Sequence, residues 1–77
     1  MPTPYATVLV HTDQGPLQLP QGSTLADAVT QLLSASGRHP ASVATAVNGH
    51  FVPRPARETH LLQSGDTVLC FSPITGG

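Results

Sequence analysis

Residues 24–37, TLADAVTQLLSASG, decide the fold, because they form the one amphipathic helix that the sequence predicts. Thr24 is the predicted N-cap, since Asp27 stands three residues later and completes a short-armed capping box. Gly37 predicts the C-terminal stop, because glycine accepts the left-handed conformation that ends many helices. The apolar side chains recur at the spacing of a single helix face. They are Leu25, Val29, Leu32 and Leu33.

Runs of β-forming residues flank this helix on both sides. The first two predicted strands are joined by turn residues 13–16, DQGP. Asn48-Gly49 predicts a second hairpin, because both residues accept the positive φ angles of a type I′ turn. The predicted strands are residues 5–11, 17–19, 43–47, 51–52 and 67–71.

The predicted order is β-β-α-β-β-β. One helix covers only one face of a sheet, so we expect an α+β roll in which a mixed sheet of four to five strands packs on the helix. The first and last strands are expected to be central and parallel. Residues 53–55, Pro-Arg-Pro, are expected to exclude regular structure. Residues 57–63 are ambiguous, with Leu61 and Leu62 expected in the core.

Strand alternation separates two sets of apolar side chains. Val8, Val10, Val68 and Cys70 are expected to face the helix. Leu9, Leu69 and Phe71 are then left on the uncovered face, although a shift of one residue would reverse the assignment. Such an uncovered set predicts a patch for docking a partner, with ordinary apolar surface as the alternative. Arg54 is the charged residue that we assign to the same partner-binding set, where it would form a salt bridge with a partner, with a solvated loop charge as the alternative.

The composition indicates one small domain, residues 1–77, and excludes several classes of function. Charged residues make up only 9% of the 77 residues, with a net charge of −1 and no lysine, so nucleic-acid binding is not expected. The single cysteine, Cys70, excludes an internal disulfide and a multi-thiolate zinc site, and is expected to be structural. No catalytic arrangement or metal-ligand spacing is present. With no signal peptide or spanning segment, we expect a cytoplasmic monomer without membrane contact.

The sequence ends in residues 71–77, FSPITGG. Glycine has no Cβ, so Gly76 and Gly77 form a narrow end that carries a free carboxylate. Pro73 is expected to end strand pairing, because it cannot donate to a ladder. We therefore expect a flexible tail from about residue 73 to residue 77.

Three stretches carry a resemblance to a known family: residues 47–54 (VNGHFVPR), residues 62–68 (LQSGDTV) and the terminal Gly76-Gly77. With these, the sequence resembles the ThiS sulfur carriers of thiamine biosynthesis, which have the ubiquitin-like β-grasp fold. Phe71 and Pro73 before the Gly-Gly also resemble the related MoaD family, the small subunits of molybdopterin synthase. The resemblance leaves the pathway open between thiamine and molybdopterin.

The resemblance implies a protein co-substrate and no catalytic residues. Gly77 would be adenylated by an E1-like (ThiF-like) adenylyltransferase, which uses ATP and magnesium, so this chain itself would bind no cofactor. A persulfide donor such as a cysteine desulfurase would then supply sulfur, and the Gly77 thiocarboxylate would pass it to a ThiG-like thiazole synthase. Ile74, Thr75 and Gly76 would serve as the tail that enters these enzymes. Two other classes remain open: a ubiquitin-like modifier of lysines and a β-grasp interaction module without tail chemistry.

Overall fold

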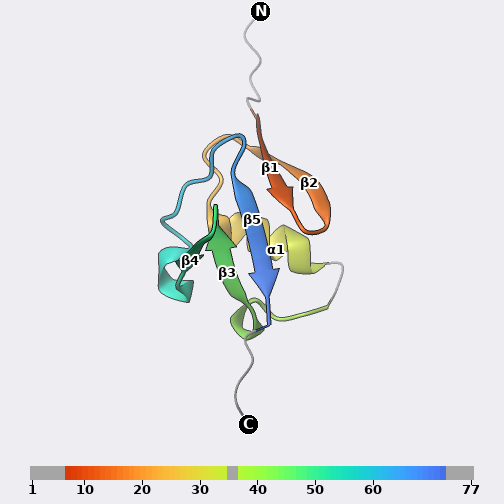
Figure 1. The fold of residues 1–77 in the computed structure, drawn as a ribbon, viewed down its shortest axis with the longest axis vertical. Coiled ribbons are helices and arrows are strands. Elements are labelled where there is room, and N and C mark those ends of the chain that lie inside the picture. Colours follow the sequence, from red (N-terminus) through yellow and green to blue (C-terminus); the bar gives the residue numbers. More distant parts are fainter. Residues whose placement is uncertain (1–6, 35–36, 73–77) are drawn as a thin grey trace, which may run out of the picture.

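The computed structural model describes residues 7–34 and 37–72. Within these residues the chain forms a five-stranded sheet, one α-helix and two short 3₁₀ helices (Figure 1). The predicted order of strands and helix is confirmed; Tyr5 and Ala6 of the first predicted strand lie outside the described residues. The elements are β1 (Thr7–Thr12), β2 (Gly15–Pro20), α1 (Leu25–Ser34), η1 (Pro40–Ser42), β3 (Ala44–Val47), β4 (His50–Val52), η2 (Arg54–Ala56) and β5 (Thr67–Phe71).

The strands lie in the order β2-β1-β5-β3-β4. The first and last strands, β1 and β5, are adjacent and parallel, as predicted, while the other three neighbouring pairs are antiparallel. Helix α1 crosses behind the sheet in Figure 1 and covers one face. This arrangement is a mixed sheet packed on one helix.

The ends of α1 form as their residues predict. The Thr24 amide donates to Asp27 Oδ2 at 2.9 Å, and the Asp27 amide donates to Thr24 Oγ1 at 3.4 Å, so the reciprocal capping box is confirmed. At the other end Gly37 has a φ of 72°, and its amide donates to the Leu33 carbonyl at 3.1 Å. Sequence-local hydrogen bonds therefore fix both ends of the helix.

The turn at Asn48 also links β3 to the start of β5. Asn48 and Gly49 have φ angles of 53° and 83°, which confirms the predicted positive-φ hairpin turn. The Asn48 side chain donates to Asp66 Oδ1 at 3.0 Å and accepts from the Thr67 amide at 2.9 Å. Asp66 Oδ2 accepts from the Gln63 amide at 2.9 Å. One asparagine thus holds the second hairpin against the central strand.

The hydrophobic core lies between α1 and the face of the sheet that it covers. Its members come from every strand, from the helix and from two loop positions. They are Val8, Val10, Leu19, Leu25, Ala28, Val29, Leu32, Leu33, Val43, Val47, Val52, Leu62 and Val68.

Two expectations for residues 53–63 are wrong. Residues 54–56 form the 3₁₀ helix η2, because the fixed φ of proline suits the first turn of a short helix as well as a loop. Leu62 is buried as predicted, but Leu61 is 60% exposed. Leu61 forms an isolated β-bridge with Thr24, so the backbone is extended there and consecutive side chains point in opposite directions.

Candidate functional site

The face of the sheet opposite α1 exposes large apolar side chains. Leu9 is 44% exposed, Leu69 39% and Phe71 44%, whereas Val8, Val10 and Val68 on the covered face are buried. Cys70, on the same side as Val68, is half-buried. The predicted assignment of the two faces is therefore confirmed. The role of the exposed side chains in docking a partner stays a prediction.

The strand register separates Leu9 from the other two residues. His11 pairs with Thr67 in the parallel β1–β5 ladder. Leu9 lies two residues before His11, and Leu69 lies two residues after Thr67. At the rise of a β-strand, this offset is about 13 Å along the strands. The sequence-predicted set is therefore not one continuous patch.

Leu69 and Phe71 instead continue into β3 and β4. Ala46 pairs with Leu69 on one side and with Phe51 on the other, and Ala44 pairs with Phe71. Phe51 is 65% exposed, more than any other large apolar side chain in the described residues. We call this surface the open-face patch: Ala44, Ala46, Phe51, Leu69 and Phe71.

Sequence reasoning missed Phe51, although a signal for it was present. A two-residue turn at Asn48-Gly49 pairs Val47 with His50 and Ala46 with Phe51. Because directly paired residues point to the same face of a sheet, Phe51 shares the face of Ala46. The turn type alone therefore places Phe51 on the open face once Val47 is known to be buried.

The open-face patch ends where the described part of β5 ends. Phe71 is the last residue of β5 and pairs with Ala44 at the beginning of β3. The next residue, Ser72, accepts a hydrogen bond from the guanidinium of Arg38. The predicted tail residues, Pro73 to Gly77, lie outside the described residues, so Gly77 stays a prediction from the sequence.

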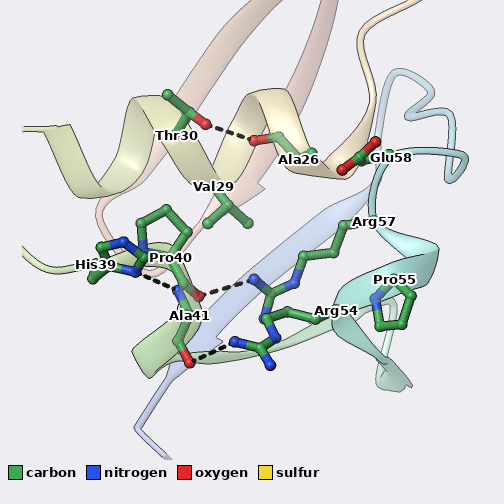
Figure 2. A pocket seen from close by; sticks show the side chains of 10 residues that line it. All are labelled: Ala26, Val29, Thr30, His39, Pro40, Ala41, Arg54, Pro55, Arg57 and Glu58. Atoms are coloured by element: carbon green, nitrogen blue, oxygen red, sulfur yellow. Dashed lines mark hydrogen bonds between the residues drawn. The ribbon is translucent and has the colours of Figure 1, made fainter.

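A cleft of about 470 Å³ lies on the helix side, between α1, η1 and η2 (Figure 2). Val29 and Pro40 contribute apolar walls, and Arg54 lies at the rim. The Arg54 guanidinium donates to the Ala41 carbonyl at 3.4 Å across this cleft. The structure therefore places Arg54 at the cleft and does not group it with Leu69 and Phe71.

Arg57 lines the same cleft but is buried, with 5% of its surface exposed. Its Nε donates to Thr45 Oγ1 at 3.1 Å, Nη1 to the Pro40 carbonyl at 3.0 Å and Nη2 to the Val43 carbonyl at 2.6 Å. Burial lowers the pKa of this guanidinium. No periodic signal predicts the burial of Arg57, because this residue follows a 3₁₀ turn where no regular alternation exists.

Cys70 lies next to Phe71 but lacks the properties of a reactive thiol. Burial raises the pKa of the Cys70 thiol, and the charge of Asp13 raises it further. A protonated thiol is a weak nucleophile, so the local environment agrees with the predicted structural role. In the described ranges no cluster of histidine, cysteine, aspartate and glutamate side chains could hold a metal ion, and no helix is long and apolar enough to cross a membrane.

Comparison with known proteins gives consistent matches in sequence and in structure. The family model described as the ThiS family matches residues 8–77. The sulfur carrier protein ThiS of Escherichia coli (strain K12) is 39% identical over 49 residues, which cover 64% of this chain and 74% of that protein.

Two solved structures with similar backbones identify the fold. The crystal structure of the thiamine biosynthesis protein ThiS from Geobacter metallireducens matches with a TM-score of 0.68 and 22% identity, covering 91% of this chain and 100% of that one. The Caldiarchaeum subterraneum ubiquitin matches with a TM-score of 0.58 and 16% identity, covering 95% of this chain and 99% of that one. The expected ubiquitin-like β-grasp fold is confirmed.

Proposed function

Because this chain belongs to the ThiS family, we propose that its terminal Gly77 carries sulfur as a thiocarboxylate for the thiazole moiety of thiamine. The E. coli relative is a sulfur carrier protein, and this chain likewise acts as a protein co-substrate and not as an enzyme. The observation that carries the proposal is the extent of the family match, which runs to residue 77 and so includes the Gly-Gly end.

The proposed chemistry explains why a carrier needs an activating partner. A carboxylate is a poor electrophile, so an E1-like, ThiF-like adenylyltransferase first joins Gly77 to AMP, using ATP and magnesium and releasing pyrophosphate. The terminal sulfur of a persulfide, supplied by a donor such as a cysteine desulfurase, then attacks the acyl carbon and expels AMP. A second thiol then attacks the donor's cysteine sulfur in the resulting acyl disulfide, forms a disulfide with it and releases the thiocarboxylate on Gly77. A ThiG-like thiazole synthase accepts this sulfur.

The open-face patch supports docking to these partners. It is apolar, it lies opposite the helix, and it includes Phe71, the last residue of β5 before Ser72 and the tail. Apolar patches of this kind on small proteins commonly mark interaction sites. A partner bound over Leu69 and Phe71 would therefore hold the body of the carrier while the narrow Gly76-Gly77 end reaches the reactive centre.

Intact mass spectrometry tests the proposal directly. The full chain is incubated with an E1-like adenylyltransferase, ATP, magnesium and a persulfide donor. We expect a mass gain equal to the exchange of one oxygen atom for sulfur, and a chain lacking Gly77 provides the matched control without that gain. An unchanged mass with every ThiF-like enzyme tested, or an equal gain in the truncated control, would contradict the proposal.

A second candidate is a MoaD-like carrier for molybdopterin synthesis, which uses the same terminal chemistry. The observation that favours it is the presence of both Phe71 and Pro73 shortly before the terminal Gly-Gly. Offering the thiocarboxylate form to a ThiG-like thiazole synthase and to the large subunit of molybdopterin synthase separates the two. Sulfur transfer to the second enzyme alone would replace thiazole synthesis with this function.

A further inference from the structure

Arg57 is a buried cation whose hydrogen-bond partners are neutral oxygens: two carbonyls and one hydroxyl. Burying a charged group costs free energy unless it is fully hydrogen-bonded, so this residue stands out in a small domain. Within the described residues no buried side-chain nitrogen or oxygen lacks a hydrogen-bond partner. The segment that the Arg57 guanidinium binds explains why a charged group is buried at this position.

All three acceptors belong to one short segment, from η1 to the start of β3. Arg57 binds the carbonyls of Pro40 and Val43 and the hydroxyl of Thr45. The same Thr45 hydroxyl donates to the Val52 carbonyl at 2.9 Å, which extends the network to β4. Figure 2 shows the guanidinium reaching across the cleft toward Pro40.

The backbone of Arg57 anchors this network to the helix. Its carbonyl accepts a hydrogen bond from the Ala26 amide in the first turn of α1 at 3.1 Å. The side chain therefore connects a rigid helix end to the segment that contains Val43 and Thr45. A lysine in this place could not span three acceptors, because an ammonium group is a compact donor whereas a guanidinium is a planar fork.

The segment that Arg57 holds is the one against which the last described residues of β5 pair. Ala44 pairs with Phe71 and Thr45 pairs with Cys70. Ala44 lies between Val43 and Thr45, both of which are bound by the guanidinium. A shift of this segment would therefore move the end of β5 and change the direction in which the chain leaves the sheet.

We propose that Arg57 is a positioning residue for the reaction at Gly77: by fixing residues 43–45 it sets where the tail leaves the sheet. This inference rests on the proposed function of Gly77. It concerns the aim of the tail. Because Ala44 and Phe71 also belong to the open-face patch, a shift of residues 43–45 would change the proposed docking surface to a smaller extent. Reactions that depend on exact placement lose on the order of 100-fold in rate for a displacement of about 1 Å.

The test compares Arg57→Met with Leu19→Ala, a core variant in β2 at the far edge of the sheet. Adenylation of the full chain by the activating enzyme is followed as pyrophosphate release, at a temperature where both variants are folded. For Arg57→Met we expect kcat to fall about tenfold or more, with a rise in KM that is smaller than the fall in kcat. For Leu19→Ala we expect unchanged kcat and KM despite a lower Tm.

An unchanged kcat for Arg57→Met, or an equal fall in both variants, would overturn the inference. If Arg57→Met does not fold, Arg57→Lys replaces it, with a smaller loss of kcat expected because one donor group is retained. If the wild-type chain is not adenylated at all, the proposed function fails. Amide hydrogen exchange of Arg57→Met against the wild-type chain then decides whether Arg57 fixes residues 43–45 and the end of β5. Faster exchange confined to β3 and Phe71 supports the inference, while a uniform change across β1, β2 and α1 contradicts it.

Discussion

The two faces of β5 differ although both are apolar. Val68 is fully buried under α1, whereas its neighbour Leu69 is 39% exposed on the open face. The difference arises because the described residues form one α-helix, which covers only one of the two faces of the sheet. A single step along the strand therefore separates a residue that stabilises the fold from one that is available to a partner.

The largest expected effect comes from placing a charge on the covered face. We predict that Val68→Asp abolishes the folded state, because an unpaired buried carboxylate costs several kcal/mol and a domain of this size has only a few kcal/mol to lose. Far-UV circular dichroism and urea titration measure this loss. A folded Val68→Asp chain of normal Tm would contradict the burial of this face.

The same change one residue later should leave the fold intact. Leu69→Asp is expected to change the free energy of unfolding by less than about 1 kcal/mol, because the side chain already contacts water. It should weaken binding to the activating enzyme about tenfold, since it puts a carboxylate into an apolar contact. Calorimetric titration and thermal unfolding separate the two quantities, and normal binding would remove Leu69 from the docking surface.

A smaller effect distinguishes the open-face patch from the set predicted by sequence. Phe51→Ala is expected to weaken binding by about 1 kcal/mol, whereas Leu9→Ala, the matched control, should weaken it by less than about 0.5 kcal/mol. The reason is that Phe51 adjoins Leu69 through Ala46, while Leu9 lies along β1 at a distance. The reverse ranking of the two variants would restore the sequence-predicted patch.

The smallest expected effect is a pH dependence of the free energy of unfolding, which comes from Cys70 on the covered face. Burial raises the pKa of the Cys70 thiol, so the folded chain retains this proton more firmly than the unfolded chain does. Its contribution to stability is complete below the pH at which an unfolded thiol ionises, and it is lost as pH rises through the folded pKa. Urea titrations from neutral to alkaline pH should therefore show a steeper decline for wild type than for Cys70→Ala. An equal decline of stability with pH in both chains would mean that the Cys70 thiol is exposed to water in the folded chain.

Local sequence signals predicted the elements well. Thr24 and Asp27 located the start of α1, and Asn48-Gly49 located the second hairpin, because each signal acts through hydrogen bonds or φ angles within a few residues. Alternation within β5 also identified its two faces correctly. Each of these features depends on chemistry contained in one short stretch of the chain.

Relations between distant segments could not be predicted in the same way. The offset between Leu9 and Leu69 depends on the register of β1 against β5, for which no local turn exists. The burial of Arg57 depends on three acceptors that lie 12 to 17 residues earlier in the chain. Leu61 and Leu62 are the same amino acid, and the isolated β-bridge between Leu61 and Thr24 decides which of the two side chains is buried.

The central place of β5 has a consequence for how the chain matures. The β1–β2 and β3–β4 hairpins are each local, but β5 follows them all and joins one to the other. During synthesis the residues of both hairpins are therefore made before β5, and the sheet closes late, since distant pairings form slowly. The same closure brings Leu69 and Phe71 beside β3, so the open-face patch exists only once the domain is closed. An enzyme that engages this surface would thereby discriminate against unfinished and misfolded copies.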